Sequence, residues 1–137
     1  MDRDEECINA SVLIVDDDDS IRETVQELLA SDGISALTAS NAGQCLAYLK
    51  AGFRGVILMD VMMPEMDGWS TIREIQQAGL AEGNIISMLT SLDSPDEQMD
   101  GLQELVVDYI VKPIEPDQLL NAVRHYLSIV EQIPGRR

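Results

Sequence analysis

The chain has 137 residues, of which 45% are hydrophobic, so it can bury the core of one domain and is short for two. Its 25 acidic residues outnumber 9 basic ones, and a formal net charge of −16 would repel a phosphate backbone, which argues against direct nucleic-acid binding. No long apolar run or signal-peptide pattern points to a membrane or to export, so we expect a cytoplasmic protein in which Cys7 and Cys45 are free thiols.

Five short apolar runs recur along the chain, and each has the length and composition of a β-strand. They are VLIV at 12–15, ISALTA at 34–39, VILM at 56–59, IISMLT at 85–90 and YIV at 109–111. The runs at 12–15 and 56–59 are apolar throughout, which is typical of strands that are covered on both faces at the centre of a sheet.

The stretches between these runs carry helical spacing and local end signals. Ser20 and Glu23 form an S-x-x-E capping box for the first helix, and Gly33 is suited to end it. Asn41 is suited to cap the second helix, and Pro116 suits the first turn of the last one. These signals agree with the helical periodicity between the strands.

Strands that alternate with helices predict an α/β fold, with a doubly wound parallel sheet, right-handed crossovers and helices on both faces. We place this domain at residues 11–131. An N-terminal extension at 1–10 precedes it, and a tail or the start of a linker follows at 132–137, where Pro134 and Gly135 interrupt the helical pattern.

Polar residues that suit phosphoryl chemistry follow the predicted strands. They are Asp16 and Asp17 after the first strand, Asp60 after the third, Thr90 after the fourth and Lys112 after the fifth. Because the carboxyl ends of parallel strands share one edge, where ligands bind, we expect these side chains to lie together. Asp18 and Asp19 we interpret as solvated loop or first-turn charges.

Three carboxylates at one edge repel each other, by about 4 kcal/mol per pair at 4 Å and an effective dielectric of 20, so the cluster needs a cation. Their hard oxygens suit Mg²⁺, whereas the central glycine and distal glutamate of a Ca²⁺ loop are missing. Beside such an ion, Asp60 is placed to act as a carboxylate nucleophile towards a phosphoryl group. Lys112 and the Thr90 hydroxyl would then bind the outer phosphoryl oxygens.

Four motifs resemble the receiver domain of two-component response regulators, in the chemotaxis-regulator-like superfamily, over Val12 to Val130. LIVDDDDSIR resembles the first-strand motif, LMDVMMPEMDGW the phosphoacceptor motif, MLTS the switch motif and DYIVKP the lysine-proline motif. The resemblance implies a flavodoxin-like (βα)5 fold whose five parallel strands have the order 2-1-3-4-5.

The resemblance also implies roles at the acidic site. Asp60 is the phosphoacceptor, and it binds Mg²⁺, or Mn²⁺ in its place, with Asp17 and the main-chain carbonyl of Met62. Asp16 assists the metal through water. Lys112 contacts the phosphoryl group.

Three further residues have implied conformational roles. Pro113 follows a cis peptide bond. Thr90 moves towards the phosphoryl group and Tyr109 turns inward. This switch changes the surface made by a helix predicted within 91–108, the fifth strand and the last helix, and a homodimer through that surface is a further option.

Two departures from the family pattern affect the expectations. Leu105 and Val106 stand where the family usually has Gly-Ala, so the output surface is expected to differ. Met62 and Leu92 are apolar at positions where some relatives carry polar side chains that orient water. Slow dephosphorylation is therefore expected.

The implied function is a signalling switch rather than a turnover enzyme. A sensor histidine kinase or phosphotransfer domain would donate the phosphoryl group, and a downstream effector domain or protein would respond. A phosphorylation-independent docking or dimerisation module is the main alternative. An aspartyl-phosphate hydrolase would need an acid at Met62, and a flavin protein would need a phosphate-cradling turn after the first strand.

Overall fold

The computed structural model describes residues 10–63, 66–90 and 106–132 of the chain. Five parallel strands form one sheet with the order β2-β1-β3-β4-β5. The strands are β1 (Val12–Val15), β2 (Ala36–Ala39), β3 (Val56–Asp60), β4 (Ile85–Thr90) and β5 (Val106–Val111). The predicted α/β class and strand order are confirmed.

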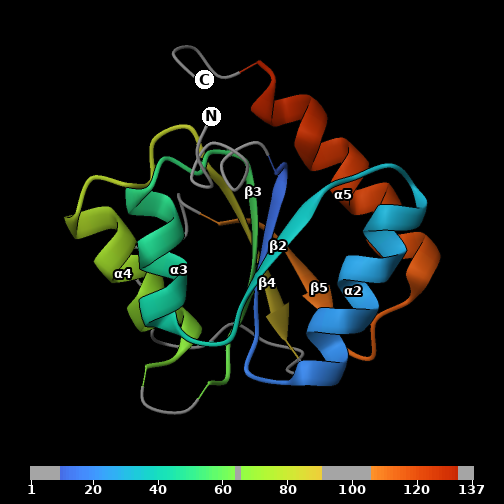
Figure 1. Cartoon of the computed structure of the whole chain (residues 1–137), viewed down its shortest axis with the longest axis horizontal. Helices are drawn as coiled ribbons and strands as arrows, with labels where there is room; N and C mark the ends of the chain where they lie inside the picture. Colours follow the sequence, from blue (N-terminus) through green and yellow to red (C-terminus); the bar gives the residue numbers. More distant parts are fainter. Residues whose placement is uncertain (1–9, 64–65, 91–105, 133–137) are drawn as a thin grey trace.

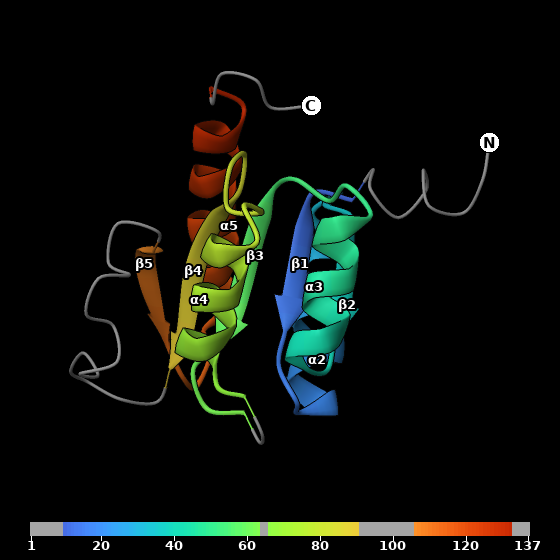
Figure 2. The ribbon, with the colours of Figure 1, turned by 90° about the vertical axis from the view of Figure 1, so that its left-hand side faces the viewer.

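Helices cover both faces of this sheet (Figures 1 and 2). The helices in the described part of the chain are α2 (Asp19–Ser31), α3 (Ala42–Lys50), α4 (Gly68–Gln77) and α5 (Pro116–Val130). One buried cluster joins α3 and α4 to one face, and a second joins α2 and α5 to the other. Among the described residues, no helix combines the length and the apolar character needed to cross a bilayer.

Burial differs between central and edge strands. Every residue of β1, β3 and β4 is buried, because helices cover both faces of these strands. The edge strands β2 and β5 are more exposed, and β5 leaves Val107, Tyr109 and Val111 partly open. Polar groups therefore gather where the central strands end, since their interiors have no room for unpaired charge.

Two strand predictions need correction. The second strand covers Ala36–Ala39, shorter than 34–39, and the Ser35 carbonyl instead accepts bonds from Ser11 and Val12. The fifth strand begins at Val106 rather than Tyr109 and contains a register shift opposite Ile86 and Ser87. The strand thus includes Val106, Val107 and Asp108, which the prediction left out.

The helix predicted within 91–108 lies for the most part outside the described residues. Its last three positions, 106–108, belong to β5 instead. Cys45 is buried and free, as predicted, while Cys7 falls outside the described residues. The same holds for Leu92 and Leu105.

The helix ends confirm most of the capping predictions. The side chain of Asn41 caps α3, Gly33 has a positive φ of 77° directly after Asp32, the C-cap of α2, and Pro116 stands in the first turn of α5. The Ser20 prediction is wrong. Asp18 is the N-cap of α2, and its Oδ1 accepts the N–H groups of Ser20 at 2.8 Å and Ile21 at 3.3 Å.

The cap at Asp18 generates a stability prediction. Asp18→Ala should lower the free energy of unfolding by about 1 kcal/mol relative to Asp18→Asn, because asparagine keeps a capping oxygen and removes the same charge. Urea unfolding measures the difference. A loss of stability in Ser20→Ala but not in Asp18→Ala would contradict this cap.

Candidate functional site

Two buried carboxylates lie side by side at the carboxyl edge of the sheet. Val15 and Met59 are register partners in the parallel pair of β1 and β3, so the next residues, Asp16 and Asp60, come together. Both are buried, whereas Asp17 is exposed. One carboxylate oxygen from each of the three lies within 4.8 Å of the others, as the sequence predicts.

Lys112 brings a positive charge to this cluster from the end of β5. Its Nζ lies 3.1 Å from Asp16 Oδ2 and 3.1 Å from Asp60 Oδ1. The peptide bond between Lys112 and Pro113 is cis, as expected. A single ammonium cannot neutralise three carboxylates, so the cluster keeps an excess of negative charge.

The environment of Asp60 disfavours its charged form. Burial and the charge of Asp16 raise the pKa of Asp60 to about 6, although Lys112 and the Met62 N–H, at 3.3 Å from Oδ1, act in the opposite direction. Burial also lowers the pKa of the Lys112 ammonium, but the bonds and charges of Asp60 and Asp16 outweigh that effect and raise it above its ordinary value. The lysine therefore stays protonated beside Asp60.

Both side-chain oxygens of Asp16 accept hydrogen bonds. The Asp18 N–H donates to Asp16 Oδ1 at 2.9 Å, while Lys112 occupies Oδ2. Arg22 donates from Nη1 to the Asp16 carbonyl at 2.7 Å. Sequence reasoning missed Arg22, and its place in the first turns of α2 after DDDD was the available signal.

Thr90 and Tyr109 lie at different depths on the neighbouring strands. Thr90 is buried at the end of β4, and its carbonyl accepts the Lys112 N–H at 2.7 Å, so Thr90 and Lys112 share the edge. Tyr109 lies two residues before the end of β5 and is 37% exposed. Its ring centroid is 6.5 Å from that of the buried Trp69.

A close backbone approach places α4 against the acidic edge. A Cβ on Gly68 would lie 2.3 Å from the Asp60 carbonyl oxygen, so only glycine fits there. The Gly68 N–H donates to the Val61 carbonyl at 2.9 Å. The sequence reasoning gave Gly68 no role, and the MDG triplet was the signal for it.

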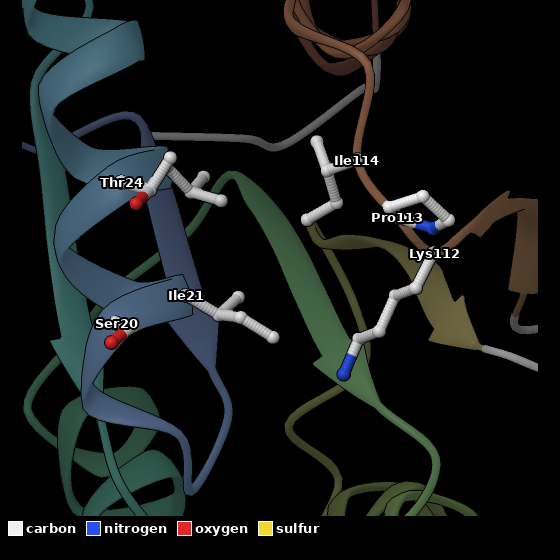
Figure 3. A pocket seen from close by; sticks show the side chains of 7 residues that line it. Ser20, Ile21, Thr24, Lys112, Pro113 and Ile114 are labelled. Atoms are coloured by element: carbon white, nitrogen blue, oxygen red, sulfur yellow. The ribbon is translucent and has the colours of Figure 1, made fainter.

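A groove of about 250 Å³ leads along one side of the site (Figure 3). Residues of α2 form one wall, and Lys112, Pro113 and Ile114 form the other. In this view the Lys112 side chain extends towards the carboxyl end of β3. The groove therefore opens beside the groups that carry the charge.

The donor set fits a small divalent cation. No described residue donates a hydrogen bond to the side chain of Asp17 or to Oδ2 of Asp60, so both can offer an oxygen. Hard carboxylate oxygens are the ligands that Mg²⁺ and Mn²⁺ prefer. Met62 follows two residues after Asp60 and is 65% exposed.

The fold and site together define a family. The response regulator receiver domain model matches residues 12–124. The chain belongs to the receiver-domain family of response regulators. The resemblance read from the four sequence motifs is thereby confirmed.

Solved receivers share this fold. A CheY-like response regulator receiver domain protein from Methanospirillum hungatei is 45% identical, with 89% of this chain and 97% of that chain covered and a TM-score of 0.85. The chemotaxis protein CheY4 of Vibrio cholerae is 34% identical, with 86% and 98% covered and a TM-score of 0.76.

Curated relatives are longer proteins. The transcriptional regulatory protein DltR of Streptococcus agalactiae is 37% identical over 113 residues, which are 82% of this chain and 50% of that protein. The probable transcriptional regulator ycf27 of Porphyra purpurea is 32% identical over 123 residues, 89% of this chain and 49% of its own length. The chain thus spans about half the length of these relatives.

The raised pKa of Asp60 generates a pH prediction. The folded protein keeps this proton up to about pH 6, whereas the ordinary pKa is 3.8, so the folded state binds more protons in that window. Stability should therefore fall as the pH rises through it. In Mg²⁺-free buffer, the melting temperature of Asp60→Asn should exceed that of the wild type by an amount that grows from pH 3.8 to 6.

Asp117→Asn, the same substitution at an exposed position in the first turn of α5, is the matched control. Melting temperatures of the three proteins at several pH values test the prediction. A difference between Asp60→Asn and the wild type that stays constant with pH would contradict it.

Proposed function

We propose that this receiver domain, at residues 11–131, accepts a phosphoryl group on Asp60 from a sensor histidine kinase or phosphotransfer domain. The observation that carries the proposal is the state of the Asp60 carboxylate. Oδ1 is 3.1 Å from the Lys112 ammonium, while no described residue donates to Oδ2. One oxygen is held in place, and the other is left to react.

The transfer follows from these positions. Oδ2 of Asp60 attacks the phosphorus of a phosphohistidine, the P–N bond breaks, and its electron pair leaves with the imidazole. The Lys112 ammonium and the Thr90 hydroxyl bind outer oxygens of the incoming phosphoryl group. A divalent cation beside Asp60 would lower its raised pKa and so favour the charged, nucleophilic form of the carboxylate.

Mg²⁺, or Mn²⁺ in its place, would be held by Asp17, Asp60 and the main-chain carbonyl of Met62, with Asp16 acting through water. When bound, the ion neutralises negative charge on the carboxylates and the phosphoryl oxygens. Asp16 suits an indirect role because both of its oxygens already accept hydrogen bonds.

Thr90 and Tyr109 would convert phosphorylation into a change of surface. Thr90 moves towards the phosphoryl group, and Tyr109 turns inward from its partly exposed position. The change reaches β5, α5 and the helix predicted between Thr90 and β5. The domain is in this sense a switch that catalyses its own phosphorylation and dephosphorylation, rather than a turnover enzyme.

The proposed partners follow from this role. A cytoplasmic kinase or phosphotransfer domain supplies the phosphoryl group, and an effector domain or protein reads the surface, which also offers a route to a homodimer. The longer relatives named as transcriptional regulators support an effector partner. A phosphorylation-independent docking module would tolerate an incomplete site, so the three clustered carboxylates and Lys112 argue against it.

Incubation with a small acyl-phosphate donor tests the phosphoacceptor. With Mg²⁺ the wild type should gain the mass of one phosphoryl group, and without Mg²⁺ most of this gain should be lost. Asp60→Asn should gain none, because an amide is not a nucleophile of this kind. Asp117→Asn is the matched control and should be phosphorylated like the wild type, as intact-mass spectrometry would show.

Phosphorylation of Asp60→Asn, or none in the wild type with Mg²⁺, would contradict the assignment. Phosphorylation that is equally fast without a divalent ion would contradict the metal site alone. These outcomes therefore test the phosphoacceptor assignment and the metal site separately.

Met62 generates a prediction about lifetime. Its exposed apolar side chain beside Asp60 cannot orient a water molecule. Met62→Asn should speed hydrolysis of the phosphorylated protein by about tenfold, less than the factor of roughly 10²–10⁴ typical of a positioned general base. Met62→Leu, which stays apolar, should hydrolyse at the wild-type rate. Equal rates in all three proteins would refute this role of Met62.

A further inference from the structure

A polar contact between two buried hydroxyls and an exposed carboxylate joins β4, β5 and α5 on the face of the sheet that α2 and α5 cover. The Tyr126 hydroxyl lies 2.8 Å from Asp108 Oδ2 and 3.1 Å from Ser87 Oγ. Tyr126 and Ser87 are fully buried among apolar neighbours. A buried hydroxyl is costly to leave without a partner, which favours the bonds of Tyr126 to the buried Ser87 and to the exposed Asp108.

The same carboxylate holds the backbone of Tyr109. Asp108 Oδ1 accepts the Tyr109 N–H at 2.8 Å, while Oδ2 accepts from Tyr126. Two consecutive hydrogen bonds therefore connect the main chain of the proposed switch residue to α5.

The register shift in β5 places the side chain of Asp108 on the sheet face that α5 covers. Val106 pairs with Ile86 and packs on the α3 and α4 side, so uninterrupted alternation would put Asp108 on that side too. Instead Asp108 pairs with Ser87, and Val107 is the extra residue. The irregularity turns the carboxylate towards α5.

We propose that Tyr126 is a positioning residue that transmits the movement of Tyr109 to α5 through the carboxylate of Asp108. This inference rests on the proposed function, since it requires a phosphorylation-driven movement at Tyr109. Burial raises the pKa of Tyr126 to about 12, so its hydroxyl remains a donor throughout the physiological range. A movement of β5 must therefore either displace α5 or break the hydrogen bond between Asp108 and Tyr126.

Two readouts in one sample test the coupling. Trp69 is the single tryptophan of the chain and contacts Tyr109, so its fluorescence reports the position of that ring. Hydrogen exchange of the α5 amides reports the helix. In the wild type, acyl phosphate with Mg²⁺ should change both signals.

Tyr126→Phe removes only the hydroxyl. It should gain the phosphoryl mass and keep the Trp69 response, while the α5 exchange response shrinks by about tenfold, because a hydrogen bond to a charged group contributes on that scale. Asp108→Ala should behave likewise. Asp108→Asn should restore the response, since its side chain can still accept from Tyr109 and donate to Tyr126.

Tyr48→Phe is the matched control, because this half-buried tyrosine of α3 has no hydroxyl partner among the described residues. It should respond like the wild type. A full α5 response in Tyr126→Phe overturns the coupling. Loss of the Trp69 response or of the mass gain in Tyr126→Phe also overturns it, since the residue would then act on the fold as a whole.

A wild type that gains mass without any α5 response overturns this inference and leaves the phosphoacceptor standing. A wild type that gains no mass overturns the proposed function, and the coupling falls with it. The mass measurement therefore distinguishes the two failures.

Discussion

The contact of Lys112 with Asp16 and Asp60 is the interaction on which the rest of the structure depends. Two buried carboxylates at neighbouring strand ends would repel each other by about 4 kcal/mol at 4 Å and an effective dielectric of 20. The ammonium, 3.1 Å from each, offsets this repulsion only in part, because Asp17 adds a third negative charge. The remaining excess of negative charge is what makes the edge suited to a divalent cation.

The fold keeps this charged cluster in one place. β1, β3 and β4 are buried along their whole length, so charged groups are accommodated only where these strands end. The parallel register then sets Asp16 beside Asp60, and Gly68 lets α4 approach the Asp60 backbone. β5 differs from these strands, since it lies at the edge of the sheet and leaves Tyr109 partly exposed.

The accuracy of the sequence predictions depended on whether the signal was local. Buried strands such as Val12–Val15 and caps such as Asn41 were predicted correctly, because an apolar run or a capping residue acts within a few positions. The cap of α2 was misplaced, because Asp18 and Ser20 both carry a suitable oxygen and only the backbone geometry distinguishes them. The start of β5 was missed, since Asp108 interrupts the apolar run and the register shift that keeps Val106 paired with β4 is a tertiary feature.

The sequence by itself determined the fold class, the family and the identity of the acidic, lysine and threonine side chains at strand ends, because alternation of elements and motif spacing are properties of the chain. The tertiary structure decided the distances and the electrostatic interactions between these groups. The pKa of Asp60, the two bonds of Lys112 and the link from Tyr109 to Tyr126 depend on burial and on distances between residues far apart in the chain. No local pattern encodes those distances, since parallel pairing and a register shift in an edge strand create them.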